Sequence, residues 1–415
     1  MNNSRSLIST LLIIFSIFIF GGLIWAIFHF SQFNLGGEGF SIQWISIQAL
    51  ARDGSDPYSN QVTGQIQAAV PRENAFVADT FPKYTSPLYS GMVIFPFTLI
   101  SNKILAHAIW MFAQLIGIFA MILVCIKLTG WKSTWFAVAI FLLLTVFSYH
   151  VLTPWLDGGL SIWAGLFLIL AMVGISSNRN EVGGVFLALA MIQPQMVILP
   201  VILILVWSIT KKSIVILLWF FITLILLSVI GLFLVPNWIM DYIRLLYRFS
   251  ENFPPGSPGL LFSSTWPGLG KQLSWLVSGV AILLLLFEWF LVMRKDFRWL
   301  LWTVCLTMAL SQWIGIPTIP SNFIELILPL ILIPAMLAER WPRTGPWVAV
   351  LMALVIFAWE WACFYLNLKG SEPALQISLI FPLPAILVTG LYWVRWWVIK
   401  PRRLLIEELR LSETY

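Results

Sequence analysis

Residues 182–207, VGGVFLALAMIQPQMVILPVILILVW, are almost entirely apolar, yet they place Gln193, Pro194 and Gln195 side by side near their centre. A helix that crosses a membrane needs about 20 such apolar residues. Pro194 has no amide hydrogen and blocks the preceding helical turn, so the run must break there. Because the pieces on either side are short for full spans, we predict a hairpin with the break at its tip.

The rest of the chain shares this apolar character. Of its 415 residues, 60% are hydrophobic and 10% are charged, against roughly 25% charged residues in soluble domains. We therefore predict an all-α integral membrane protein of about 12 transmembrane helices, with residues 1–415 forming a single polytopic domain. The apolar runs are 7–30, 105–126, 134–152, 160–175, 182–192, 195–209, 213–235, 273–293, 299–315, 321–338, 345–366 and 378–399.

The basic residues predict the orientation of these helices. With a cytoplasmic N-terminus, most of the 24 lysines and arginines fall in short cytoplasmic loops or in a cytoplasmic tail, residues 400–415, as the positive-inside rule requires. Two long outer loops remain, 31–104 and 236–272. Residues 87–100 are too few to cross, and counting them as a span would invert every later loop. We expect a plasma membrane protein with both termini cytoplasmic and with the first run kept as an anchor.

Composition also excludes several function classes. The formal charge of +6 comes from bases in the short loops between spans, so no nucleic-acid partner is expected. The three cysteines lie inside apolar runs, and the three histidines are widely separated. A disulfide framework, a zinc site and a histidine-based triad are therefore not expected.

The first outer loop has a helical pattern of its own. In FSIQWISIQALARDG, residues 40–54, Phe40, Trp44 and Ile47 recur at helical spacing. We predict an amphipathic helix lying on the membrane, ended by Gly54 and the turn SDPY. Residues 87–100 predict a second, interfacial or re-entrant helix in the same loop.

Several polar residues fall at membrane depth, where they need protein or water around them. We predict that Gln193 and Gln195 share one polar cavity with Asp157, at the outer leaflet. The alternative is that the two amides bond across helices as packing contacts. Glu288, Glu325 and Glu360 also lie within runs and have no evident basic partner in their own spans. They are either relay groups of a transporter or acids that are buried and protonated or interfacial.

Three segments together resemble glycosyltransferase family 87, a group of integral membrane GT-C enzymes that includes polyprenol-phosphate-mannose-dependent mannosyltransferases. They are GGEGFSIQWISIQALARDGSDPYSNQV (36–62), KYTSPLYSGMVIFPFTLIS (83–101) and GGVFLALAMIQPQMVILP (183–200). The resemblance covers roughly residues 7–235. In the first segment, the residues that match the family pattern are Phe40, Trp44, Gly54, Pro57 and Tyr58.

Two positions depart from the family pattern. The family has an aspartate at the position of Gly39, and the nearest acid here is Glu38. The family has a lysine at the position of Gln193, which cannot carry charge. If the aspartate is the general base, as the resemblance implies, this chain either uses Glu38 in a shifted geometry or has lost activity.

The resemblance implies transfer of a sugar, a mannose-like hexose or a pentose, from a polyprenyl-phosphate donor to a lipid or glycan acceptor in the cell envelope, at the extracytoplasmic face. Glu38 is the expected base, and Asp157 and Asp79 are alternatives for the base or for a divalent cation (Mg²⁺ or Mn²⁺), whose use stays open. A transporter or lipid flippase, or a catalytically inactive lipid-binding subunit, is the alternative function. The expected substrate-binding residues are Trp44, Tyr58, Lys83, Tyr84, Gln193, Gln195, Arg244 and Arg248.

Overall fold

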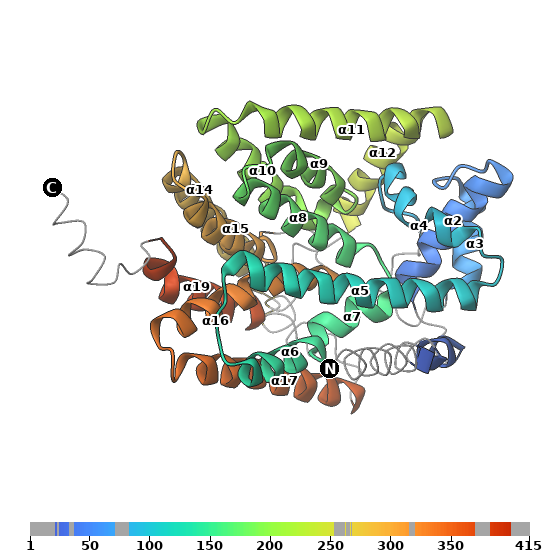
Figure 1. Ribbon diagram of the computed structural model, residues 1–415. Helices are drawn as coiled ribbons and strands as arrows, with labels where there is room; N and C mark the ends of the chain where they lie inside the picture. Colours follow the sequence, from blue (N-terminus) through green and yellow to red (C-terminus); the bar gives the residue numbers. More distant parts are fainter. Residues whose placement is uncertain are drawn as a thin grey trace, which may run out of the picture. The chain divides into compact units, whose positions relative to one another are not determined.

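The computed structural model describes residues 21–22, 25–32, 37–70, 83–252, 262, 266, 268–314, 320–369 and 382–399, with the backbone alone at 248–252, 271, 320 and 367–369. It is 83% helical, with no strand among these residues, and so confirms the all-α prediction (Figure 1). The helices are α2 (Glu38–Asp53), α3 (Asn60–Ala69), η2 (Leu88–Ser90), α4 (Gly91–Thr98), α5 (Lys103–Thr129), α6 (Trp135–Val146), α7 (Tyr149–Asp157), α8 (Ser161–Ser176), α9 (Asn180–Ala190), α10 (Pro194–Thr210), α11 (Ile214–Leu234), α12 (Trp238–Asn252), α14 (Gly270–Val292), α15 (Phe297–Ser311), η3 (Pro320–Leu326), α16 (Ile327–Arg340), α17 (Gly345–Lys369) and α19 (Pro382–Ile399).

Among the described residues, six helices are long and apolar enough to cross a membrane. The helices α6 and α7 are bent by 52° at the break between them and would together form a seventh span. The helices α8, α9, α10 and α15 are apolar but shorter. Every run predicted from residue 105 onward overlaps a helix where the structure describes it, although the run 134–152 covers α6 and part of α7. The count of about 12 crossings stays a prediction. The six long helices are Lys103–Thr129, Ile214–Leu234, Gln272–Val292, Ser321–Arg340, Gly345–Leu366 and Pro382–Ile399.

The chain divides into two compact units. The first comprises Met1–Phe119, Trp155–Leu160 and Ser228–Leu246, and the second comprises Ala120–Pro154, Ser161–Leu227 and Tyr247–Tyr415.

In the first unit, the predicted helix in the outer loop is present as α2, but its apolar face does not lie on lipid. Phe40, Trp44 and Ile47 are buried. Phe40 stacks on His107 of α5, and the indole N–H of Trp44 donates to the carbonyl of Phe97 at 3.2 Å. The α2 face is apolar because it packs against protein. The prediction that this face rests on the membrane was therefore wrong.

The second predicted helix of this loop is present as η2 and α4, which together cover Leu88–Thr98. Ile47 of α2 lies directly over Gly91, where an added Cβ would come within 2.4 Å of its side chain. This close approach fixes α4 against α2. The helix α3 lies between α2 and α4 in the sequence and was not predicted. Only Val62 and Ile66 of α3 are buried, so its apolar pattern is too short to indicate a helix.

In the second unit, the helices surround α15 and α16, whose side chains are almost all buried. The helix α17 lies along α6 and α16, and α19 contacts α15 and α16 (Figure 1). The indole N–H of Trp302 on α15 donates to the carbonyl of Leu391 on α19 at 2.8 Å. The apolar exposed side chains of α14 and α17 are those expected to meet lipid.

The break predicted at Gln193–Gln195 is present. The helix α9 ends at Ala190, and α10 begins at Pro194. Proline suits the first position of a helix, because the amide hydrogen it lacks would have no helical partner there. The helix α9 packs along α8, where Gly174 and Gly183 allow close backbone approach. That the break is the tip of a hairpin stays a prediction.

Two acids predicted at membrane depth have basic partners that come from other helices. Glu288 of α14 accepts hydrogen bonds from Arg395 at 2.7 Å and from Tyr392 at 3.1 Å, both on α19. Glu360 of α17 lies 2.8 Å from Nδ1 of His150 on α7. A third acid, Glu325 of η3, accepts a hydrogen bond from Gln312 at 2.6 Å instead. All three acids are buried. Burying an unpaired carboxylate costs free energy, and these partners offset that cost.

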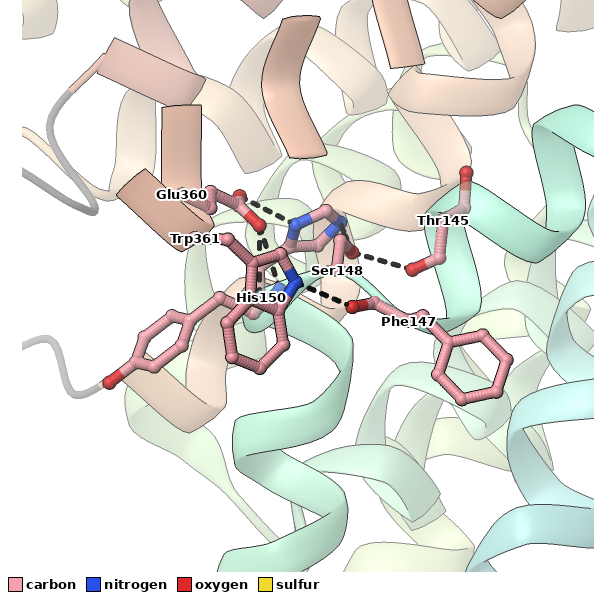
Figure 2. Close-up of polar contacts among 7 residues, drawn as sticks. Thr145, Phe147, Ser148, His150, Glu360 and Trp361 are labelled. Atoms are coloured by element: carbon pink, nitrogen blue, oxygen red, sulfur yellow. Dashed lines mark hydrogen bonds and ion pairs between the residues drawn. The ribbon is translucent and has the colours of Figure 1, made fainter. Parts of the chain in front are cut away.

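Figure 2 shows the polar contacts around Glu360 at the bend between α6 and α7. Its carboxylate accepts the backbone N–H groups of Tyr149 and His150 at 2.8 and 3.4 Å, and so caps the N-terminus of α7, where the helix dipole favours negative charge. The hydroxyl of Ser148 lies 3.3 Å from Nε2 of His150. Trp361 donates to the carbonyl of Phe147 at 3.0 Å. The bend is therefore held by side chains of α17.

Candidate active site at the first turn of helix α2

The first turn of α2 lacks a capping side chain of its own. Gly37 precedes it in the left-handed conformation, with φ of 77°, and has no side chain to accept a hydrogen bond. The first backbone N–H groups of a helix have no partner within the helix. The N–H of Gly39 donates to Oδ1 of Asp157 at 3.1 Å. A carboxylate 118 residues away in the sequence thus takes the place of the missing cap, at the end of the helix that favours negative charge.

The turn that carries Asp157 is held by α5. Asp157 ends α7, and Gly158 follows in the left-handed conformation with φ of 71°, as is common for the residue after a helix. The indole of Trp110 donates to the carbonyl of Gly158, and the amide of Gln114 donates to the carbonyl of Gly159, each at 2.7 Å. Both backbone acceptors of this turn are therefore paired.

Two glycines give this carboxylate its space, and a third allows the turn to lie close to Phe40. A Cβ built on Gly39 would lie 2.5 Å from Oδ2 of Asp157 and 2.9 Å from the backbone of Gly159. A Cβ on Gly159 would lie 2.8 Å from the same oxygen, and one on Gly158 would lie 2.7 Å from Cβ of Phe40. The carboxylate of Asp157 therefore occupies the space into which a side chain at position 39 would project.

Substituting Gly39 by alanine tests this packing. The added methyl group must displace either the carboxylate of Asp157 or the backbone of Gly159. We expect Gly39→Ala to cost about 1–3 kcal/mol in free energy of unfolding, as overpacking does. The measurement is thermal unfolding.

The matched control is Gly64→Ala in α3, where an added Cβ meets nothing within 4 Å. Alanine has the higher helix propensity, so this change is expected to stabilise by up to about 1 kcal/mol. A Gly39→Ala protein with wild-type stability would show that the carboxylate is not held where the structure has it.

Glu38 and His107 lie at the same turn. Glu38 is the first residue of α2. The ring of His107 stacks on Phe40 with centroids 4.8 Å apart, and its Nε2 would lie 2.6 Å from a Cβ on Gly37. His107 is far from the other two histidines in the chain, so the spacing of the histidines indicated no site there. The sequence feature that could have indicated His107 is its position one turn after Lys103, near the start of the apolar run that follows the outer loop.

The predicted aromatic binding residues have their polar atoms bonded within the protein. The hydroxyl of Tyr58 donates to the carbonyl of Ser86 at 2.8 Å, and that of Tyr84 donates to the carbonyl of Pro87 at 3.1 Å. Their rings meet edge to face, 5.3 Å apart. Burial raises the pKa of both phenols, so both stay protonated at neutral pH. Together with Trp44 they hold residues 83–98 against α2, and substrate binding by them stays a prediction.

The predicted basic residues differ in setting. Lys83 is partly buried beside Tyr84. Arg244 of α12 is exposed and lies 3.4 Å from Asp241, and ion pairs of this kind contribute little to stability. The side chain of Arg248 and the whole of Asp79 lie outside the described residues. A role for these residues in binding phosphate stays a prediction.

The two glutamines belong to the second unit. Gln193 is buried, and its Nε2 donates to Oδ1 of Asn322 on η3 at 2.9 Å. This contact supports the alternative in which the amides bond across helices. Gln195 is partly buried. The cavity predicted to join them to Asp157 stays a prediction, since Asp157 is counted in the first unit.

In the part of the chain that the structure describes, no group of three or more histidine, cysteine, aspartate or glutamate side chains could hold a metal ion. The site brings two acids together at the first turn of α2. Glu38 begins this helix, and Asp157, the last residue of α7, accepts the N–H of Gly39. Whether a divalent cation joins them stays open.

The described part of the chain contains helices and no strand, and six or seven of its helices are long and apolar enough to cross a membrane, as in a multi-span membrane protein. The model of glycosyltransferase family 87 matches residues 84–317. The chain therefore belongs to this family, and it is a membrane glycosyltransferase. The matched range includes Asp157 but begins after α2. No curated protein and no solved structure matches the chain.

Proposed function

We propose that this glycosyltransferase moves a sugar, a mannose-like hexose or a pentose, from a polyprenyl-phosphate donor to a lipid or glycan acceptor. The reaction takes place at the extracytoplasmic face of the plasma membrane, and the first turn of α2 is the active site. The observation that supports this site most is the carboxylate of Asp157, which fills the space beside Gly39. Position 39 is where the resemblance implies an acid.

In this proposal, Asp157 is the general base. The acceptor hydroxyl oxygen attacks the anomeric carbon of the donor sugar, and its proton passes to the carboxylate. The bond between the anomeric carbon and the phosphate oxygen breaks, and the polyprenyl phosphate leaves with the electron pair. Lys83, Arg244 and Arg248 are the candidates to stabilise the negative charge of the departing phosphate.

The helix setting suits a base that must hold its position. The N–H of Gly39 donates to Oδ1, and in this proposal Oδ2, which lies beside Gly39 and Gly159, takes the proton of the acceptor hydroxyl. The side chains of Trp110 and Gln114 fix the turn behind the carboxylate. Such fixed orientation is what proton transfer in a transition state needs. Glu38 lies on the same turn and supplies a second negative charge beside the base.

The same arrangement weakens the case for a catalytically inactive subunit. That alternative rested on the absence of an acid at position 39 and of a lysine at position 193. In this proposal, Asp157 supplies the acid that position 39 lacks. Gln193 bonds to Asn322 inside the second unit, which suits a packing role and needs no charge. The acids within the spans were what favoured a transporter or lipid flippase, and Glu288 and Glu360 are paired with Arg395 and His150.

The proposed reaction is tested by supplying purified protein in lipid nanodiscs with synthetic polyprenyl-phosphate mannose or pentose and a lipid-linked glycan acceptor. The expected result is a glycosylated acceptor together with released polyprenyl phosphate, measured by mass spectrometry. The absence of transfer with every donor and acceptor pair would contradict the proposal.

Glu38→Gln separates the two carboxylates. We expect this variant to retain at least a tenth of the wild-type transfer rate, because Glu38 neighbours the base without accepting the proton. The same nanodisc assay measures it. A loss from Glu38→Gln as large as that from Asp157→Asn would move the base to Glu38, with the site unchanged.

A further inference from the structure

The ring of His107 is pressed against the backbone at the start of α2. It comes from α5 and stacks on Phe40, with the ring planes 27° apart. Nε2 points at Gly37, where even a Cβ would come within 2.6 Å. Glycine is thus required on both sides of Glu38, at 37 by this histidine and at 39 by Asp157. Two side chains from distant parts of the sequence converge on one helical turn.

Nε2 of His107 is buried and has no hydrogen-bond partner among the described residues. The residue as a whole is 5% exposed. Buried polar atoms in folded proteins are nearly always paired, and each exception calls for an explanation. Aromatic packing on Phe40 does not supply one, because a phenylalanine would make the same stack without an unpaired nitrogen. The nitrogen is therefore in place for a partner that binds.

The charges at this turn narrow down that partner. Glu38 and Asp157 are both acids, and the N–H of Gly39 is already taken by a carboxylate. An anionic group at Nε2 would meet repulsion from both acids, and the basic residue that acts on this histidine is Lys103, one turn earlier on α5. Metal binding is not supported either, because no group of three metal-binding side chains occurs among the described residues. A hydroxyl group fits, since it can donate to or accept from a histidine nitrogen in either tautomer.

We propose that Nε2 of His107 binds a hydroxyl group of the sugar substrate at the first turn of α2, beside the carboxylate of Asp157. The inference rests on the proposed function and adds a substrate-binding residue to it. His107 holds the hydroxyl-bearing ring against the turn, while Asp157 takes the proton. The hydroxyl belongs either to the donor sugar or to the acceptor, and the experiment distinguishes these two sources.

The small number of histidines makes a direct test feasible. The chain contains three, so a protein labelled with ¹⁵N-histidine gives few ring resonances, and the one lost in His107→Gln identifies His107. The probes are polyprenyl-phosphate mannose alone and an alkyl mannoside acceptor alone, each added to labelled protein in nanodiscs. We expect the Nε2 resonance of His107 to shift when one of the two probes is added. The probe that causes the shift carries the hydroxyl group that His107 binds. A resonance that stays in place with both overturns the inference, whether or not transfer is observed.

Kinetics of two substitutions provide the second readout. His107→Phe keeps the stack on Phe40 and removes the nitrogen, so the midpoint of thermal unfolding is expected to stay equal or rise. The KM for the mannosyl substrate is expected to rise at least tenfold. His107→Gln keeps a polar atom near the place of Nε2 and is expected to stay within threefold of wild type. A His107→Phe protein with wild-type KM would contradict the inference.

His29→Phe is the matched control. His29 also stacks on an aromatic ring, that of Trp25, with centroids 5.2 Å apart, but it is exposed. Replacing it removes a histidine nitrogen without touching the first turn of α2, so no change in KM is expected. If wild-type protein transfers no sugar at all, the proposed function fails, and the nitrogen resonance alone then decides the inference about His107.

Discussion

Asp157→Asn should lower the rate of sugar transfer by about 10²–10⁴, the range that a positioned general base contributes. The amide oxygen of asparagine can still accept the N–H of Gly39, so the cap on α2 survives. The amide cannot take a proton from the acceptor hydroxyl. The expected pattern is a loss in kcat at an almost unchanged unfolding temperature, measured by single-turnover transfer and thermal unfolding in nanodiscs.

The control for Asp157→Asn is Asp53→Asn. Asp53 lies in the same unit, at the last residue of α2, and is exposed. Substitutions at exposed positions of this kind stay within about 0.5 kcal/mol, and the carboxylate lies at the opposite end of α2 from its first turn. We expect no more than a threefold change in rate. Near wild-type transfer by Asp157→Asn would remove Asp157 as the base.

Glu360→Ala should be the most destabilising single substitution of a charged residue in the second unit. The carboxylate pairs with His150 and accepts two backbone N–H groups at the start of α7. His150 and Glu360 are both almost fully buried, at 4% and 2% exposure. Removing one partner of a buried pair costs about 3–5 kcal/mol. The free energy of unfolding measures this loss.

A double-mutant cycle isolates the pair itself. In a protein that already carries His150→Phe, Glu360→Ala should lower the free energy of unfolding by less than it does in the wild type. In that background no buried imidazole loses its partner. Glu339→Gln on α16 serves as the control, since this acid is exposed and such changes stay within about 0.5 kcal/mol. Additive costs for the two substitutions would indicate that His150 and Glu360 do not interact.

The sequence predicted the helices well because membrane spans are signalled locally. Apolar runs give the length of each helix, and Pro194 marks the break between α9 and α10 to within a few residues. The periodicity of Phe40, Trp44 and Ile47 indicated α2 but not what its apolar face meets. The hydrophobic pattern of a face buried in protein is the same as that of a face lying on lipid.

The partners of the buried acids could not be predicted in this way. His150 lies 210 residues from Glu360, and Arg395 lies 107 residues from Glu288. Pairs like these depend on which helices are neighbours, and a single sequence gives no evidence of that. Neither acid has a basic residue in its own span, because both partners come from other helices.

The same limit applied to the candidate site. In the sequence, Gly39 stands out as a missing acid, and Asp157 as an acid before two glycines. Only the fold shows that the carboxylate of Asp157 lies where a side chain at 39 would be. Glycine at 39 and aspartate at 157 are then parts of one arrangement, and neither could be interpreted without the other.

The most direct test of this arrangement is a cryo-electron microscopy structure of the protein in nanodiscs with a non-cleavable polyprenyl-phosphonate sugar and the acceptor. The account predicts the sugar at the first turn of α2, with Oδ2 of Asp157 about 2.6–3.2 Å from the acceptor hydroxyl, as a general base requires. A sugar bound away from this turn, with Asp157 contacting only the backbone of Gly39, would contradict it.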